Sequence, residues 1–321
     1  MPKEGMKPHL IEFWPYLTEN PERIRLEIDP TFVKVGSEEV PAGLEEVVVE
    51  GLTPAMRSDA DQLWSEGLLK NSKMTNGSKV VIKNIPEDGG SVRLHNSNYK
   101  SSFWLKKRAS EYPFEAQREL ARYFAILNIG MVSVTSDDLI LMQQRPDNVT
   151  APLMLLTYPA GFAEKEHKTV ADTVNEESDE EMGFPILDAQ GKLYSKIKSL
   201  TPLGLQRESD EWTPSYVYTV KLNVPRSEIG KTEEVKNIVT LPADPHCLIE
   251  AIVEKYSPTT KGDEVRNRLV PNATGMLALY IRSVAGEQGY VNLVDKLTEV
   301  SKKQGRTLEM RNYTVLTNPF R

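Results

Sequence analysis

The chain of 321 residues has a single cysteine, Cys247, so it cannot form a disulfide within itself, and a zinc site built from several cysteines is excluded. Long apolar runs are also missing, because the longest one, 123–134, is too short to cross a bilayer and is interrupted by Asn128. The first ten residues carry three charged side chains and no apolar segment of the kind found in signal peptides. We therefore expect a soluble, cytoplasmic protein without a membrane partner.

An excess of positive charge is absent as well. Lys and Arg together number 39 and Asp and Glu 46, so the formal net charge is −7. Surfaces that coat nucleic acid are usually basic, so we expect nucleic acid not to be a partner. With 39% hydrophobic and 26% charged residues, the composition is that of a globular chain long enough for a large core and for more than one domain.

The predicted elements divide the chain into three parts. Residues 1–126 predict a small α+β module, with strands at 23–33, 45–49, 79–85 and 91–96 and helices at 54–69 and 114–127. Residues 127–256 predict a core with strands at 131–135, 139–144, 154–158, 193–205, 215–222 and 237–241 and helices at 170–182 and 245–256. Residues 257–321 predict a helical extension packed on the core, with helices at 272–284 and 291–303 and an edge strand near 310–316. This order favours an α/β fold with a mixed sheet.

An acidic helix that follows a glycine turn is the most informative segment. Thr169 with Asp172 three residues later is a capping-box pattern, and Gly183 is typical of a left-handed C-cap, so we predict a helix over 170–182. The turn before it, Pro-Ala-Gly-Phe-Ala-Glu at 159–164, allows the close backbone approach that phosphate-handling loops require.

Three glutamates, Glu177, Glu180 and Glu181, are spaced i, i+3 and i+4 and share one face of this helix. Like charges on one turn repel each other unless a cation neutralises them, and hard carboxylate ligands suit Mg²⁺ or Mn²⁺. An acidic run can also be a solvated helix face. The turn at Gly161 favours the metal site over that alternative.

At these residues the chain resembles the Nudix hydrolases, whose signature reads Gly, five residues, Glu, seven residues, Arg-Glu-apolar-x-Glu-Glu-x-Gly-apolar. Gly161 matches the first glycine, the three helix glutamates match the metal ligands, and Gly183 and Phe184 match the end. The resemblance implies a Nudix-type α/β/α sandwich with a mixed sheet and metal-dependent attack of water on a pyrophosphate bond. The metal ligands that it implies for Mg²⁺, with Mn²⁺ as the other option, are Glu177, Glu180 and Glu181. Glu164, at the end of the glycine turn, is predicted as a fourth metal ligand or as a partner of the other ligands.

The signature is irregular in four places. His167 occupies the position of the first glutamate, Glu176 that of the arginine, and Ser178 that of the apolar residue. The spacing from Gly161 to Glu177 is one residue longer than the family pattern. An alternative to a hydrolase is therefore a Nudix-fold protein with impaired catalysis that binds a nucleotide or a protein partner.

The general base is predicted from outside the signature. Nudix enzymes often take it from a glutamate in a loop, and Glu234, before the strand at 237–241, has such a position. The acidic loop with Glu208, Asp210 and Glu211 is the rival, and His167 is a further candidate, because histidine is a common general base.

Substrate contacts call for cations and aromatic rings. Arg145, at the end of a hairpin strand, and Arg207 are the candidates for binding the anionic part of a substrate. Trp212 or Tyr216 is the candidate for stacking on a base. Gly161 is expected to approach the phosphates.

A weaker resemblance concerns the first part of the chain, which looks like the N-terminal module of Nudix enzymes that cleave UDP-sugars. It rests on the series Gln62, Trp64, Asn76-Gly77, Lys79, Arg93-Leu94-His95 and Tyr99. The implied substrate is a UDP-sugar, with ADP-ribose or a related nucleotide next, whereas capped RNA is disfavoured by the acidic balance. Many Nudix enzymes are dimers, so a homodimer is one possible assembly.

Overall fold

The computed structural model describes most of the chain. The described ranges are 9–14, 23–28, 32–35, 38–41, 54–70, 78–85, 91–146, 153–209, 212–230, 237–257 and 266–312, with single positions at 72, 76, 232 and 235. The predicted strand at 45–49 and the candidate base Glu234 lie outside these residues.

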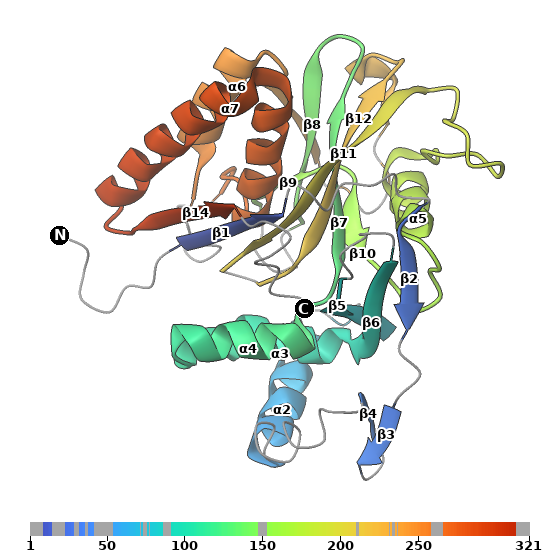
Figure 1. Ribbon diagram of the computed structural model, residues 1–321, viewed down its shortest axis with the longest axis vertical. Helices are drawn as coiled ribbons and strands as arrows, with labels where there is room; N and C mark the ends of the chain where they lie inside the picture. The colour runs from blue at the N-terminus through green and yellow to red at the C-terminus, as the bar shows by residue number, and fades with distance from the viewer. Residues whose placement is uncertain are drawn as a thin grey trace.

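A mixed sheet forms the centre of the molecule and, within the described residues, has nine strands in the order β13-β8-β7-β12-β11-β1-β14, with β10 paired to β7 and β9 to β8 (Figure 1). The strands are β1 (His9–Trp14), β7 (Asn128–Val134), β8 (Leu139–Gln144), β9 (Leu155–Thr157), β10 (Ala160–Phe162), β11 (Ile197–Glu208), β12 (Ser215–Leu222), β13 (Asn237–Pro242) and β14 (Leu308–Asn312). β7 is parallel to β12 and β1 to β14, while the other pairs are antiparallel. The protein is therefore a mixed α/β protein, as predicted.

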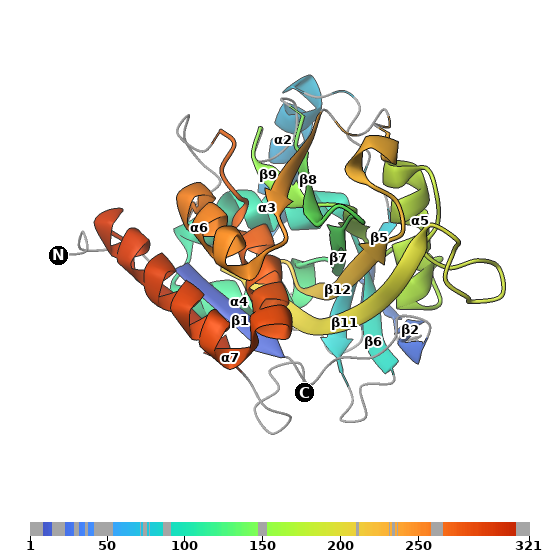
Figure 2. The same ribbon diagram turned by 90° about the horizontal axis from the view of Figure 1, so that it is seen from above.

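Helices cover both faces of this sheet (Figure 2). Helix α5 (Val170–Met182) lies on one face, where Val174 joins a buried cluster with Tyr218 and Val220 of β12. Helices α6 (Pro245–Lys255) and α7 (Pro271–Lys303) cover the other face, where Met276 shares a cluster with Val217 of the same strand. Successive side chains of β12 point to opposite faces of the sheet, because a strand has a period of two. The sheet is therefore the middle of three layers.

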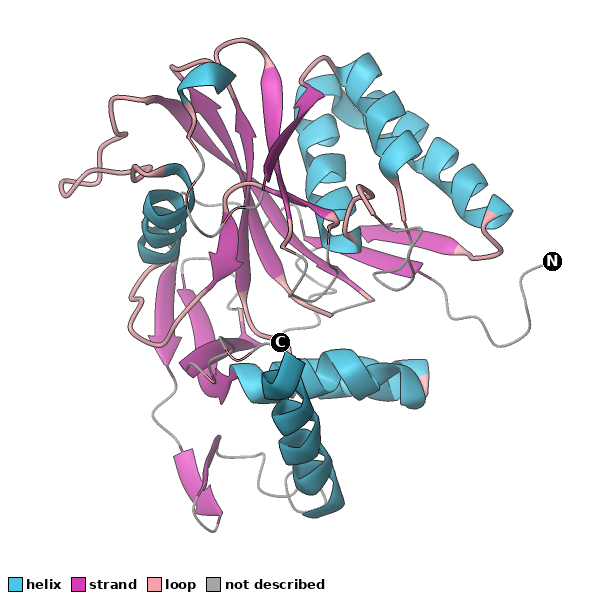
Figure 3. Cartoon of the chain, turned by 180° about the vertical axis from the view of Figure 1, so that it is seen from behind, coloured by secondary structure: helices cyan, strands magenta, loops and turns pink. Residues whose placement is uncertain are grey.

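The first part of the chain adds smaller elements at one end of the sheet (Figure 3). They are a sheet of β2 (Arg25–Ile28), β6 (Ser91–Asn98) and β5 (Ser78–Asn84), a hairpin of β3 (Phe32–Val35) and β4 (Glu38–Pro41), and helices α2 (Pro54–Lys70), α3 (Tyr99–Arg108) and α4 (Phe114–Phe124). The amide of Leu127 donates to Val80 O at 2.8 Å, and that of Leu26 to Lys168 O at 2.8 Å. The three-stranded sheet is thereby attached beside the start of α5.

The structure differs from the sequence predictions in several elements. β1 and α3 were not predicted, and the predicted strand at 23–33 is divided into β2 and β3. The main sheet takes β1 from the first predicted part and β14 from the third, and the division at 126 and 256 stays a prediction. The two predicted C-terminal helices are the two halves of α7, which Gly286 separates with a non-helical φ of 67°. No helix in the described part of the chain is long and apolar enough to cross a membrane.

A buried ion pair connects β1 to β11. Arg207 donates from Nε and Nη2 to Oε2 of Glu12 at 2.9 and 2.6 Å, and Arg118 of α4 donates to Oε1 at 3.1 Å. The Arg207 guanidinium lies over the rings of Trp14 and Trp212, at 5.7 and 5.3 Å from their centroids. Because both partners of the pair are almost fully buried, each depends on the other for compensation of its charge.

We expect Glu12→Ala to lower the free energy of unfolding by about 3–5 kcal/mol, because it leaves the Arg207 cation buried without its carboxylate. Urea unfolding followed by circular dichroism measures the change. Glu309→Ala is the control, since Glu309 pairs with Arg311 at the surface, where such a pair contributes under about 1 kcal/mol. Equal losses in the two variants would show that the buried pair has no special role.

Candidate functional site

Helix α5 is fixed at both ends by its own sequence. The side chain of Thr169 accepts from the amide of Asp172 at 3.3 Å, and Asp172 accepts from the amide of Thr169 at 2.8 Å, which completes the capping box. Gly183 adopts the left-handed conformation with φ of 78°, and its amide donates to Asp179 O at 2.9 Å. The predicted bounds of the helix, 170–182, are confirmed.

Gly161 lies directly beneath Glu177, the first of the three predicted ligands on helix α5. It belongs to β10, where it pairs with Ile129 of β7. A Cβ atom at Gly161 would fall 1.7 Å from Cδ of Glu177 and within 2.0 Å of both carboxylate oxygens. No side chain fits between β10 and α5 at this point, so glycine is required for the Glu177 carboxylate to lie against the backbone of the turn.

Glu181 holds the helix to the strands. Its side chain is buried, and its two oxygens accept from Nε2 of Gln143 and from the amide of Ala160, each at 3.0 Å. The hydroxyl of Tyr158 donates to the carbonyl of Glu181. The carboxylate therefore contacts β8 and β10 at once.

The charges of the helix glutamates act on one another. Burial first, and then the charges of Glu181 and Glu180, raise the pKa of Glu177 to about 8, whereas Lys79 opposes the shift. Glu180 is exposed. A divalent cation would relieve the repulsion that raises this pKa.

The oxygen donors here fit a hard cation such as Mg²⁺ or Mn²⁺ in their chemistry. In the described residues no group of three or more His, Cys, Asp or Glu side chains is already arranged as metal ligands. A complete coordination shell therefore requires a rotation, such as that of the exposed Glu180 side chain, or water molecules, of which Mg²⁺ usually keeps several.

Glu164, the fourth predicted ligand, forms an ion pair with Lys79 of β5. The Lys79 side chain is 16% exposed and that of Glu164 is 39% exposed. The three-stranded sheet thus places a cation beside the glycine turn, close enough to influence Glu177. Lys79 appeared in the sequence only as a member of a loosely spaced series.

His167 and Glu176, the two residues that differ in charge from the family signature, contact each other. His167 Nε2 lies 2.7 Å from a carboxylate oxygen of Glu176, and His167 Nδ1 accepts from the amide of Glu164 at 3.1 Å. Because Nδ1 accepts, the ring proton resides on Nε2 and is donated to Glu176. His167, a hydrogen-bond donor, thus occupies the glutamate position of the signature, and Glu176, an acid, occupies the arginine position. The two residues contact each other.

Aromatic rings and a second lysine surround the same turn. Phe162 follows Gly161, and Lys106 Nζ lies 5.5 Å from its ring centroid. The ring of Tyr99 is 6.3 Å from that of Phe162, and the ring of Trp64 is 6.1 Å from that of Tyr99. In the sequence Lys106 reads as part of a basic surface cluster, so only the fold shows that it reaches the glycine turn.

The predicted substrate residues lie in different surroundings. Arg145 is half-buried at the end of β8, where its amide donates to Met154 O at 2.9 Å. Arg207 contacts Glu12 in the interior, and Trp212 is buried and donates to Oε1 of Gln117 at 3.4 Å. Their roles in substrate binding stay predictions. Of the rival base loop, Glu208 is buried, while Asp210 and Glu211 lie outside the described residues.

Comparison with known proteins does not assign a family. No family model matches the sequence, and no curated protein matches it. The structure is similar to the crystal structure of DR0079 from Deinococcus radiodurans, with a TM-score of 0.28 and 16% identity over 43% of this chain and 78% of that one. It is also similar to the solution structure of the E. coli ORF135 protein, with a TM-score of 0.30 and 10% identity over 50% of this chain and 94% of that one. Likenesses of this strength carry no argument about function.

We expect Gly161→Ala to displace the Glu177 carboxylate and to weaken Mn²⁺ binding by roughly tenfold or more, since the added methyl group overlaps that carboxylate. Electron paramagnetic resonance of Mn²⁺ measures the affinity directly. Gly230→Ala is the matched control, because a Cβ there meets nothing within 4 Å. Unchanged Mn²⁺ affinity in Gly161→Ala would show that Glu177 does not bind the metal.

The raised pKa of Glu177 predicts a pH dependence of stability in chelator. The folded state holds this proton up to a pKa of about 8, whereas the unfolded chain releases it near 4.5, so this group lowers the free energy of unfolding as pH rises between those values. We expect Glu177→Gln to remove that contribution. The free energy of unfolding of the variant, relative to that of the wild type, is then higher at pH 8 than at pH 5. Urea unfolding of both proteins at several pH values tests the difference, and parallel profiles would contradict it.

Proposed function

We propose that the protein is a metal-dependent pyrophosphohydrolase of the Nudix type. The observation that carries the proposal is the Glu177 carboxylate, which is packed on the backbone of Gly161, lies near Glu181, and has its pKa raised to about 8. This is a site where negative charge is concentrated at a glycine turn without enough local cations. Such an arrangement suits a bound Mg²⁺ and a phosphate group better than it suits the metal-free state.

Bound Mg²⁺ or Mn²⁺ would neutralise charge that develops on the phosphoryl oxygens and lower the pKa of a water molecule. Glu177 and Glu181 would hold the cation, with Glu180 as the third ligand. Glu164 orients Lys79 through their ion pair. Gly161 leaves room for the Glu177 carboxylate, since any side chain there would occupy its position.

The proposed substrate is a nucleoside diphosphate linked to another group, a UDP-sugar first and ADP-ribose or a related nucleotide next. Lys79 and Lys106 offer cations for the diphosphate, and Phe162 and Tyr99 offer rings for a base or sugar. Arg145 stays a candidate for a further phosphate contact. Glu234 stays the proposed general base, which takes a proton from the attacking water.

The alternative is a nucleotide-binding or protein-interaction module that has lost hydrolysis. The observation that favours it is that both carboxylate oxygens of Glu181 already accept hydrogen bonds, from Gln143 and Ala160. A ligand whose oxygens are occupied binds a metal more weakly, because those bonds must be exchanged.

The deciding experiment is a substrate screen with UDP-glucose, ADP-ribose, dinucleoside polyphosphates and capped RNA, with Mg²⁺ and with Mn²⁺. We expect release of a nucleoside monophosphate from a nucleoside diphosphate conjugate, and a loss of roughly 10²-fold or more in Glu177→Gln and in Glu181→Gln. Chromatography of the products measures both. Glu166→Gln is the control, since Glu166 is exposed and lies near Lys165 rather than in the site.

Full activity in Glu177→Gln would refute the proposal. Calorimetry distinguishes the alternative, because binding of nucleotide and Mg²⁺ without turnover of any compound would identify a binding module.

A further inference from the structure

A cavity of about 480 Å³ lies away from the glutamate site. It is at the end of β7, next to Val134, whereas Gly161 pairs with Ile129 near the start of that strand. Five residues of strand separate the two positions, which is about 17 Å. The volume is within the range of sites that hold small molecules. Nothing in the proposed hydrolysis uses this cavity.

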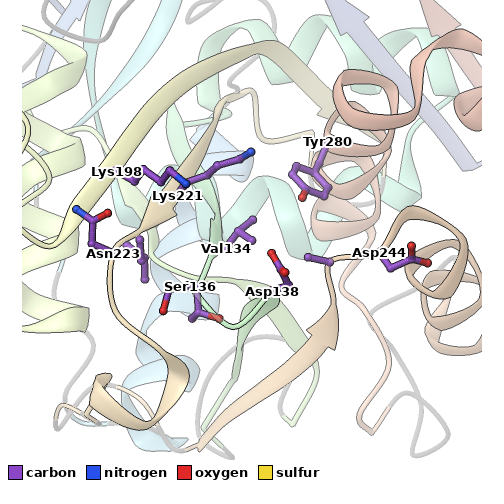
Figure 4. Close-up of a pocket in the computed structure, with 11 residues that line it drawn as sticks. Val134, Ser136, Asp138, Lys198, Lys221, Asn223, Asp244 and Tyr280 are labelled. Carbon is purple, nitrogen blue, oxygen red and sulfur yellow. The ribbon is translucent and has the colours of Figure 1, made fainter.

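One wall of the cavity is cationic. It contains Lys198 of β11 and Lys221 of β12, both exposed, and Figure 4 shows their side chains together on one side. In the register of the two strands Ile197 pairs with Leu222 and Ser199 with Lys221, so Lys198 is the extra residue of a β-bulge. A bulge changes the direction of a side chain, which explains how residues on neighbouring strands both reach the cavity.

The other wall offers hydrogen-bonding groups. Tyr280 of α7 is buried, and Figure 4 shows its hydroxyl directed toward the side of the cavity where Asp138 lies. Burial and the nearby Asp138 raise the pKa of Tyr280, so its phenol keeps its proton and donates. The Asp138 carboxylate accepts. A ligand thus meets cations on one side and a donor with an acceptor on the other.

Hydrogen bonds hold the loops around the cavity in place. The amide of Ser136 donates to Val224 O at 3.0 Å, and the amide of Ala243 donates to Asp138 O at 3.0 Å. Asp244 turns to helix α6, where it accepts from the amide of Cys247 at 3.0 Å. The cavity is therefore formed before any ligand arrives, which lowers the entropic cost of binding.

We propose that this cavity binds a small phosphorylated polyol, of the sugar phosphate class, with the phosphate at Lys198 and Lys221 and the hydroxyl groups at Asp138 and Tyr280. Two ammonium groups from adjacent strands suit a group with more than one negative charge. The polar opposite wall suits hydroxyl groups, each of which both donates and accepts. The proposal is independent of the hydrolase assignment.

Isothermal titration calorimetry of the full chain in chelator tests it, with glucose 6-phosphate, inorganic phosphate and glucose as probes. We expect glucose 6-phosphate to bind more tightly than either of the other two. Lys198→Ala/Lys221→Ala weakens this binding at least tenfold, whereas Lys302→Ala/Lys303→Ala, which removes the same charge from the exposed end of α7, leaves it unchanged. Glu177→Gln also leaves it unchanged, which excludes binding at the glutamate site.

Tyr280→Phe separates the two walls of the cavity. It removes only a hydroxyl, so we expect it to weaken glucose 6-phosphate binding several-fold and to leave inorganic phosphate binding as it is. The proposal is overturned if glucose 6-phosphate does not bind at millimolar concentration, if it binds no better than inorganic phosphate, or if the two double-lysine variants behave alike.

Discussion

The position of Glu181 is the constraint on which the glutamate site depends. Its carboxylate accepts from Gln143 of β8 and from the amide of Ala160 of β10, so one side chain fixes the distance between helix α5 and two strands. At that distance Glu177, one turn earlier, lies with its carboxylate over the backbone of Gly161. The burial and the carboxylate repulsion that raise the pKa of Glu177 therefore act at a place that the hydrogen bonds of Glu181 help to fix.

Negative charge around the glycine turn is partly offset by parts of the chain that are distant in sequence. Lys79 comes from β5 and pairs with Glu164, while Lys106 comes from α3 and lies over Phe162. His167 is hydrogen-bonded to Glu176 beside the turn. The first part of the chain therefore contributes to the electrostatics of the turn, and its attachment beside α5 through Leu26 and Lys168 makes this contribution possible.

Local signals made parts of this structure predictable from sequence. The capping box and Gly183 define α5, and runs of strand-forming residues bounded by turns indicate β8 and β12. The core strand β1 was missed because every residue in it is buried and its partners are remote. The Glu12–Arg207 pair was missed for the same reason, since its partners are 195 residues apart. The pair holds Arg207 in the interior, whereas the sequence predicted a substrate contact. Residue spacing reveals which charges share a helix turn, but not which ones meet through the sheet.

The pairing of β1 has a consequence for the order in which the chain assembles. Leu10 bonds to Ser209, 199 residues away, and β14, on the other side of β1, comes later still. During synthesis β1 is made before the other described strands, but β11 is complete only at Glu208 and β14 only at Asn312. Contacts of such long range slow folding. An apolar strand that waits this long is also the segment most exposed to wrong partners, so we expect chaperone dependence to concentrate there.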